Sequence, residues 1–309
     1  TGGAGFIGHH LARALLARGL AVTVLDDLSM GRAENVPPEA RLVTGDVRDA
    51  AALETALEGV DCVFHEAAMV SVRASRDRFV DDAGVNLMGT LQLLHAMERA
   101  RVRNAVLASS MAVYADRPRR EPIAESAPTE PISAYGIAKL AAEKYWLLLC
   151  RAAGIRATVL RYFNTYGPGQ SFTPYVGVVT IFVDRLLAGK PPLIFGDGEQ
   201  CRDYVHVGDV VAANLLALDS ECDGRIFNVG TGNGTTVNEI ASDLIARLAP
   251  GLEPIYEPAQ PGEVRNSIAD IAAIRRALGF QPTRPRLDCS EVIAFRRAAA
   301  GSRHSGVQR

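Results

Sequence analysis

The segment Thr1-Gly2-Gly3-Ala4-Gly5-Phe6-Ile7-Gly8 decides the fold of this chain, because it places Gly-x-Gly-x-x-Gly at positions 3, 5 and 8 immediately before an apolar-periodic helix. Such glycines permit a tight turn and let the backbone approach a pyrophosphate, whose charge the N–H groups at the helix start stabilise. The strand-like run 21–25 follows and ends at Asp26, about twenty residues beyond the glycines, where an acid would hold ribose hydroxyls. A glycine turn without a ligand is the alternative. The two halves together predict a dinucleotide site, and the carboxylate favours NAD over NADP because it repels a 2′-phosphate.

Strand-like runs then alternate with amphipathic stretches, which predicts βαβ units and a Rossmann-type, doubly wound parallel α/β sheet. The strands are expected at 21–25, 41–44, 61–65, 104–109 and 157–161, and the helices at 50–57, 86–100 and 134–152. Functional side chains should gather at the carboxyl ends of the strands. A Rossmann unit has an apolar strand before its glycine turn, and this chain begins at the turn. We therefore expect the first strand to be missing from the sequence.

Proline and glycine break the alternation after Tyr166-Gly167-Pro168-Gly169, which predicts a smaller C-terminal substrate-binding lobe. The predicted boundaries are 1–167 for the NAD-binding domain, rejoined by about 206–232, and 168–300 for the lobe. Residues 301–309 are expected to form a frayed tail.

Tyr135 and Lys139 place a phenol and an ammonium four residues apart in a chain with only three lysines and 30 arginines. Positions i and i+4 of a helix share a face. The cation would lower the pKa of the phenol from about 10 and make Tyr135 a proton acceptor near neutral pH. An incidental surface pair is the alternative.

Composition limits the remaining possibilities. A net charge of −2 predicts no nucleic-acid partner. The five cysteines are odd in number and lack metal-ligand spacing, which predicts free thiols in a reducing cytoplasm and no metal site. The sequence has no apolar run of about 18 residues, so no association with a membrane is predicted.

Many ordered stretches resemble one family over nearly the whole chain: the extended short-chain dehydrogenase/reductases that act on nucleotide sugars, most closely the UDP-glucose 4-epimerases. The matching stretches are TGGAGFIG at 1–8, DDLS at 26–29, GDVRD at 45–49, FHEAA at 64–68, SSMAVY at 109–114, YGIAK at 135–139, RYFNTYGPG at 161–169, FGDGEQCRDYVHVGDV at 195–210, NVGTG at 228–232 and PGEVRNSIAD at 261–270.

The resemblance implies a catalytic trio of Ser110, Tyr135 and Lys139 and a tightly bound NAD. Tyr135 would take the proton of the sugar 4-hydroxyl while hydride leaves C4, Lys139 would bind the nicotinamide ribose, and Ser110 would donate to the developing ketone oxygen. The implied cofactor-binding residues are Gly2, Gly5, Phe6, Ile7, Gly8, Asp26, Asp27, Ser29, Asp46, Val47, Ala67, Ala68, Asn86, Ser109, Tyr135, Lys139 and Tyr162.

The resemblance also implies a UDP-sugar substrate, and its contacts would be Ser110, Asn164, Phe195, Arg202, Tyr204, Glu263, Arg265 and Ser267. Ser267 borders the sugar where some relatives carry tyrosine, so N-acetylhexosamines and hexuronates stay possible beside hexoses. Gln260 departs from the arginine that is common before Pro261. Either Arg265 or another basic group compensates at the phosphates, or the affinity for the nucleotide sugar is lower.

Relatives that eliminate water or decarboxylate carry acids just after the catalytic serine or threonine, because removing a C5 proton or a 6-hydroxyl needs its own acid/base pair. Met111 and Ala112 stand here, and neither transfers a proton. This predicts redox-neutral epimerisation at C4 through a 4-keto intermediate. The alternatives are a nucleotide 4-keto-sugar reductase and a non-enzymatic NAD-sensing protein.

Leu87, Leu91 and Leu94, with the apolar residues of 145–149, resemble the two-helix dimer face of the family and predict a homodimer. Ordinary core helices show the same pattern, so both interpretations stay open.

Overall fold

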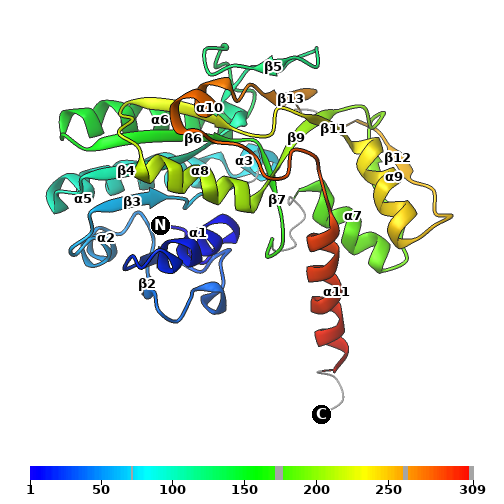
Figure 1. Cartoon of the computed structure of the whole chain (residues 1–309), viewed down its shortest axis with the longest axis horizontal. Coiled ribbons are helices and arrows are strands. Elements are labelled where there is room, and N and C mark those ends of the chain that lie inside the picture. Colours follow the sequence, from blue (N-terminus) through cyan, green and yellow to red (C-terminus); the bar gives the residue numbers. More distant parts are fainter. Residues whose placement is uncertain (71, 171–176, 260–263, 306–309) are drawn as a thin grey trace.

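A four-stranded parallel sheet with the order β10-β6-β4-β3 forms the centre of the protein (Figure 1). The computed structural model describes residues 1–70, 72–170, 177–259 and 264–305. The strands of this sheet are β3 (Cys62–His65), β4 (Asn104–Ser110), β6 (Arg156–Tyr162) and β10 (Arg225–Val229), and the parallel pair β1 (Thr23–Asp26) and β2 (Arg41–Thr44) lies beside it. The predicted doubly wound α/β fold is confirmed.

Thr1 and Gly2 bridge the β1–β2 pair and the central sheet. The Thr1 nitrogen donates to the Phe64 carbonyl at 2.8 Å, and the Gly2 nitrogen donates to the Leu25 carbonyl at 2.8 Å. Among the described residues, no strand lies between β1 and β3. The glycine turn therefore starts between these two strands, at the carboxyl edge of the sheet.

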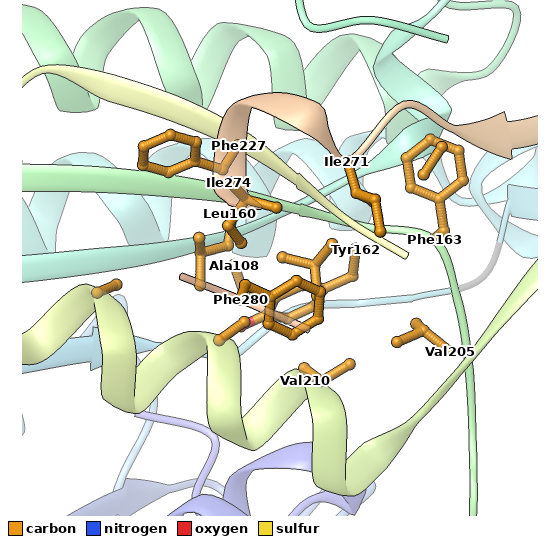
Figure 2. Close-up of a cluster of buried hydrophobic side chains, with 14 of the residues drawn as sticks. Ala108, Leu160, Tyr162, Phe163, Val205, Val210, Phe227, Ile271, Ile274 and Phe280 are labelled. Carbon is orange, nitrogen blue, oxygen red and sulfur yellow. The ribbon is translucent and has the colours of Figure 1, made fainter. Parts of the chain in front are cut away.

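Helices cover both faces of the sheet because successive strand residues point to opposite sides. Ala105 and Leu107 pack with α2 (Ala50–Ala56), α5 (Thr90–Ala100) and α6 (Ala134–Ala152). Val106 and Ala108 pack instead on the side of α8 (Val207–Asp219) and α10 (Ala272–Leu278). Figure 2 shows Phe280 near the α8 residue Val210, and Leu160, Tyr162 and Phe227 belong to the same cluster. Helix α1 (Phe6–Ala17) joins α8 through the cluster of Leu11, Leu15 and Val211.

The smaller lobe is built on strands with the order β11-β9-β13-β5, and β7 pairs with β9. Its strands are β5 (Pro122–Ile123), β7 (Asn164–Tyr166), β8 (Leu193–Phe195), β9 (Cys201–His206), β11 (Gly234–Thr236), β12 (Ile255–Glu257) and β13 (Asn266–Ala269). Its helices are α7 (Val178–Leu187), α9 (Val237–Leu248) and α11 (Ser290–Ser305), which lie together away from the main sheet (Figure 1).

Short elements complete the chain: α3 (Val72–Asp77), α4 (Phe79–Ala83), the π-helix η2 (Gly84–Gly89) and the 3₁₀ turns η1 (Ala33–Asn35) and η3 (Met111–Val113). The predicted helix 86–100 is therefore a π-helical turn followed by α5. Within the described residues, none of the helices combines the length and the apolar content needed to cross a bilayer.

The structure can be compared with two predictions about the organisation of the chain. The segment of about 206–232 expected to rejoin the NAD-binding domain contains α8 and β10, and β10 pairs in parallel with β6. The tail expected to fray from residue 301 is helical through Ser305, because α11 continues across that boundary. The domain boundaries themselves stay a prediction.

Candidate active site

The glycine turn packs against its neighbours without room for side chains. Gly2 has φ +73°, and a Cβ there would lie 2.5 Å from the Ala67 nitrogen, while a Cβ at Gly8 would lie 2.1 Å from the Gly2 carbonyl oxygen. The N-cap of α1, Gly5, supplies no side-chain cap for the helix N–H groups. A bare helix start behind a side-chain-free turn fits a pyrophosphate.

Asp26 ends β1 beside this turn and is buried. Its carboxylate accepts hydrogen bonds from the Ala4 and Leu28 nitrogens, each at 2.9 Å. These bonds fix the carboxylate at the carboxyl end of the strand, and each oxygen keeps a second lone pair for a ribose hydroxyl. The predicted NAD site is therefore compatible with the geometry of the turn and of Asp26.

Helix α6 begins at a serine cap: Ser133 Oγ accepts from the Gly136 nitrogen at 3.0 Å. Gly136 allows close approach to η3, since a Cβ there would lie 2.2 Å from the Ala112 carbonyl oxygen. Tyr135 and Lys139 are both buried and lie four residues apart within α6, so they share one face of the helix. The predicted shared face is confirmed.

The Ser110 hydroxyl lies beside the phenol of Tyr135. Ser110 Oγ accepts from the Ala112 nitrogen at 3.2 Å, so its own proton can be donated to another oxygen. The pKa of Tyr135 is raised to about 12, mainly by burial; the charges of Asp82 and Glu66 contribute to this rise, and the Ser110 hydroxyl opposes it. The predicted lowering of this pKa by Lys139 is wrong for this structure, because loss of solvent outweighs the favourable contacts.

Lys139 donates from Nζ to the Ala108 carbonyl oxygen at 2.8 Å. Burial lowers the pKa of Lys139 to about 8, whereas the carboxylates of Glu66, Asp82 and Glu143 raise it. The ammonium is thus fixed to strand β4.

Glu66, which follows β3, reaches across the strand ends to β6. Its carboxylate accepts from the Tyr162 hydroxyl at 2.7 Å, and Asn214 of α8 donates to the same hydroxyl at 2.7 Å. Burial raises the pKa of both Glu66 and Tyr162. Tyr162, a predicted cofactor contact, is therefore held at the strand ends beside Ser110, with which it pairs in register.

The other predicted cofactor residues surround this edge. Asp27 accepts from the Ser29 nitrogen and hydroxyl, and Asp46 pairs with Arg48. Asn86 is buried and exchanges hydrogen bonds with the Met69 backbone, so it fixes the loop after β3.

Ser109 is buried and donates to Glu143 Oε1 at 2.5 Å, so its hydroxyl is directed into the interface between β4 and α6. The roles of these residues toward the cofactor stay predictions.

Four of the predicted substrate residues meet where β7, β9 and β13 run side by side. Asn164 Nδ2 lies 3.5 Å from Ser267 Oγ, and Ser267 pairs in register with Arg202. Arg202 donates to the Arg265 carbonyl at 3.0 Å. The Arg265 side chain makes a two-point ion pair with Asp197, at 2.7 and 2.8 Å.

The structure gives less support to the other residues predicted to contact the substrate. Tyr204 is buried in the core cluster of the smaller lobe with Phe182 and Ile240, so its ring is core packing. Phe195 ends β8 and pairs with β12. Glu263, like Gln260, lies outside the described residues.

Three residues at the site were missed by the sequence interpretation. Glu143 repeats the spacing of Tyr135 and Lys139 and could have been found by extending it. Glu66 had no signal beyond its place after a strand. Asp203 is fully buried and accepts from the nitrogens of Thr231, Gly232 and Ala269, which fixes β9 beside β13.

The sequence matches the NAD dependent epimerase/dehydratase family over residues 1–230. A UDP-glucose 4-epimerase of Mycolicibacterium smegmatis is 38% identical, over 91% of this chain and 92% of that protein. Among solved structures, the UDP-glucose 4-epimerase of Thermotoga maritima with UDP-glucose superposes with a TM-score of 0.91 at 38% identity, covering 97% of this chain and 98% of that one. The Thermus thermophilus UDP-glucose 4-epimerase in complex with NAD gives 0.86 at 38% identity, with 95% of each chain covered. The chain therefore belongs to the NAD dependent epimerase/dehydratase family of enzymes, whose cofactor is NAD.

Proposed function

We propose that this enzyme interconverts UDP-glucose and UDP-galactose by inverting C4 of the sugar through a transient 4-keto intermediate. The observation that carries the proposal is that the Ser110 hydroxyl lies beside the buried Tyr135 phenol at the carboxyl edge of the sheet, with the Lys139 ammonium fixed to the same strand. Similarity to UDP-glucose 4-epimerases over more than nine-tenths of the chain supports it.

Each member of the trio has one role in this proposal. The oxygen of Tyr135 takes the proton of the 4-hydroxyl and later returns it. Ser110 donates to the sugar oxygen as its charge develops, and Lys139 supplies a fixed positive charge. Bound NAD would supply the acceptor and donor for the C4 hydride. The glycine turn and Asp26 would hold its pyrophosphate and ribose.

The residues after Ser110 favour epimerisation over elimination. Met111 and Ala112 have no group that transfers a proton, and η3 holds them against α6. A reaction that removes the C5 proton or the 6-hydroxyl would need an acid and a base at such positions.

Asn164, Arg202 and Ser267 are proposed to bind the nucleotide sugar. Ser267 is smaller than the tyrosine that some relatives carry, which supports room for an N-acetyl group, and UDP-N-acetylhexosamine is the second candidate substrate. Arg265 is proposed at the phosphates. Its ion pair with Asp197 would have to open for the guanidinium to reach them.

A homodimer through α5 and α6 is also proposed. Tyr145 and Leu148 of α6 are 44% and 65% exposed, and Met88, in η2 before α5, is 49% exposed. Leu94, also predicted for this face, is instead buried in the core, so the exposed face is narrower than the sequence predicted.

The test is incubation of the purified enzyme with UDP-galactose and no added NAD, with UDP-glucose followed by chromatography. Tyr135→Phe should reduce turnover by about 10²- to 10⁴-fold, the usual contribution of a positioned proton-transfer group. Tyr256→Phe is the control, because it removes a phenol oxygen on the exposed strand β12.

Three outcomes would contradict the proposal: full turnover in Tyr135→Phe, a 4-keto-6-deoxy product in the mass spectrum, or a requirement for added reduced cofactor. UDP-N-acetylgalactosamine in a parallel reaction distinguishes the two candidate substrates.

A further inference from the structure

Three residues at the end of β4 each contact a different residue of one stripe on α6. Ser110 lies beside Tyr135, Ala108 accepts from Lys139, and Ser109 donates to Glu143. Because 135, 139 and 143 are four residues apart, they lie on one face of the helix. Three consecutive residues of the strand thus contact the helix. Two of these contacts involve the proposed catalytic trio, and the third is the one between Ser109 and Glu143.

The third contact involves a buried ion pair. Glu143 and Arg161 are 2% and 3% exposed, and Arg161 donates to the two Glu143 oxygens at 2.9 and 2.7 Å. Arg161 lies on β6 and pairs in register with Ser109. Glu143 therefore contacts both strands at once, one residue before Ser110.

Further hydrogen bonds hold Arg161 in place. Arg161 donates to the Tyr114 hydroxyl at 2.9 Å, and that hydroxyl donates to Asn228 of β10 at 2.6 Å. This chain of bonds crosses β4, β6 and β10 at their carboxyl ends.

Stability alone does not explain why these two charges are buried. Apolar residues of similar volume often stabilise a fold as much as a buried ion pair does, or more. A paired charge instead defines direction and distance through several hydrogen bonds. This pair lies one residue from the contact between Ser110 and Tyr135. A fixed geometry of the pair would therefore also fix that contact.

We propose that Glu143 and Arg161 are positioning residues, which hold the end of β4 at the register on α6 that keeps the Ser110 hydroxyl on the Tyr135 oxygen. This proposal rests on the proposed function only in so far as it predicts an effect on turnover. The effect on Tyr135 itself is independent of which reaction the enzyme performs.

Tyr135 is the group on which the pair would act. Ser110 faces it from β4, Asp82 from α4, Glu66 from the segment after β3, and Lys139 lies on its own helix. Of these, the Ser110 hydroxyl lowers the pKa of Tyr135, whereas the charges of Asp82 and Glu66 raise it. Displacing the Ser110 hydroxyl should therefore raise the pKa of Tyr135.

Ser109→Ala is the decisive variant, because it removes the link between β4 and Glu143 and leaves the ion pair intact. Asn104→Ala is the matched control: Asn104 accepts from Arg156 at 2.8 Å, which joins the same two strands at their opposite ends. Glu143→Gln, with Glu143→Asp as the conservative partner, tests the pair directly.

For Ser109→Ala we expect kcat to fall about tenfold with little change in KM, since small displacements of reacting groups cost one to two orders of magnitude. The acidic limb of the rate–pH profile should move to higher pH. Asn104→Ala should change neither. Glu143→Gln should lower kcat further, and Glu143→Asp should restore part of it.

A second readout needs no turnover. Fluorotyrosine at position 135 is titrated by ¹⁹F NMR in the full-length protein with NAD added. Ser109→Ala should weaken ionisation of this phenol about tenfold, or one pKa unit, while Asn104→Ala leaves it unchanged. An unchanged titration and unchanged kcat in Ser109→Ala, or equal effects of Asn104→Ala, would overturn the proposal. Inactive wild-type protein with the expected ¹⁹F shift would count against the proposed function alone.

Discussion

Lys139 combines burial with a positive charge at the site. Its side chain is 3% exposed, and one strand carbonyl and three carboxylates offset part of the lost solvation. The remaining desolvation lowers the pKa of Lys139 to about 8, so the charge that the proposed reaction uses destabilises the folded protein at neutral pH.

The stability of the protein should consequently depend on pH through Lys139. Between about 8 and 10.5 the unfolded chain still binds a proton at this lysine while the folded chain has released it. Stability therefore rises with pH in that window, by about 3 kcal/mol for this group. Other groups titrate there too, so the measurement is the difference in urea unfolding free energy between wild type and Lys139→Met. A difference that does not change with pH would show that the folded protein keeps this ammonium charged throughout.

At the scale of the element, α6 depends on its cap to place Tyr135, which lies two residues beyond Ser133. Ser133→Ala removes the acceptor for the Gly136 nitrogen and should lower stability by about 1 kcal/mol. It should also lower kcat, because fraying of the first turn would move the phenol from Ser110.

Thr236→Ala provides the comparison for this prediction. Thr236 caps α9 through a capping box with Glu239, in the smaller lobe. Its loss should affect the urea midpoint by a similar amount and leave kcat unchanged. Equal losses of kcat in both variants would mean that turnover follows global stability and not the placement of α6.

At the scale of the whole molecule, the exposed apolar side chains of α6 predict self-association. Leu148→Asp should convert the dimer to a monomer in light scattering, because burial of a carboxylate in an apolar interface is unfavourable. Leu20→Asp is the control, since Leu20 is 43% exposed at the end of the turn after α1. A wild-type protein that is monomeric at micromolar concentration would contradict the proposed interface.

Much of the fold follows from local pattern. Strand β2 and helix α6 begin and end at the predicted residues, and α8 and β10 rejoin the sheet as expected. Periodicity and glycine spacing are properties of neighbouring residues, so one sequence reveals them. The π-helical turn before α5 and the extension of α11 to Ser305 were missed, because element ends depend on tertiary contacts.

The sequence by itself determined the glycine turn, the acid after β1, and the shared face of Tyr135 and Lys139, because each is a spacing within one or two elements. Only the tertiary structure decided the direction of the Tyr135 pKa shift, the core position of Tyr204, and the joining of Ser109, Glu143 and Arg161. Desolvation and long-range hydrogen bonds depend on what the rest of the chain packs around a group. No spacing along the sequence specifies that surrounding.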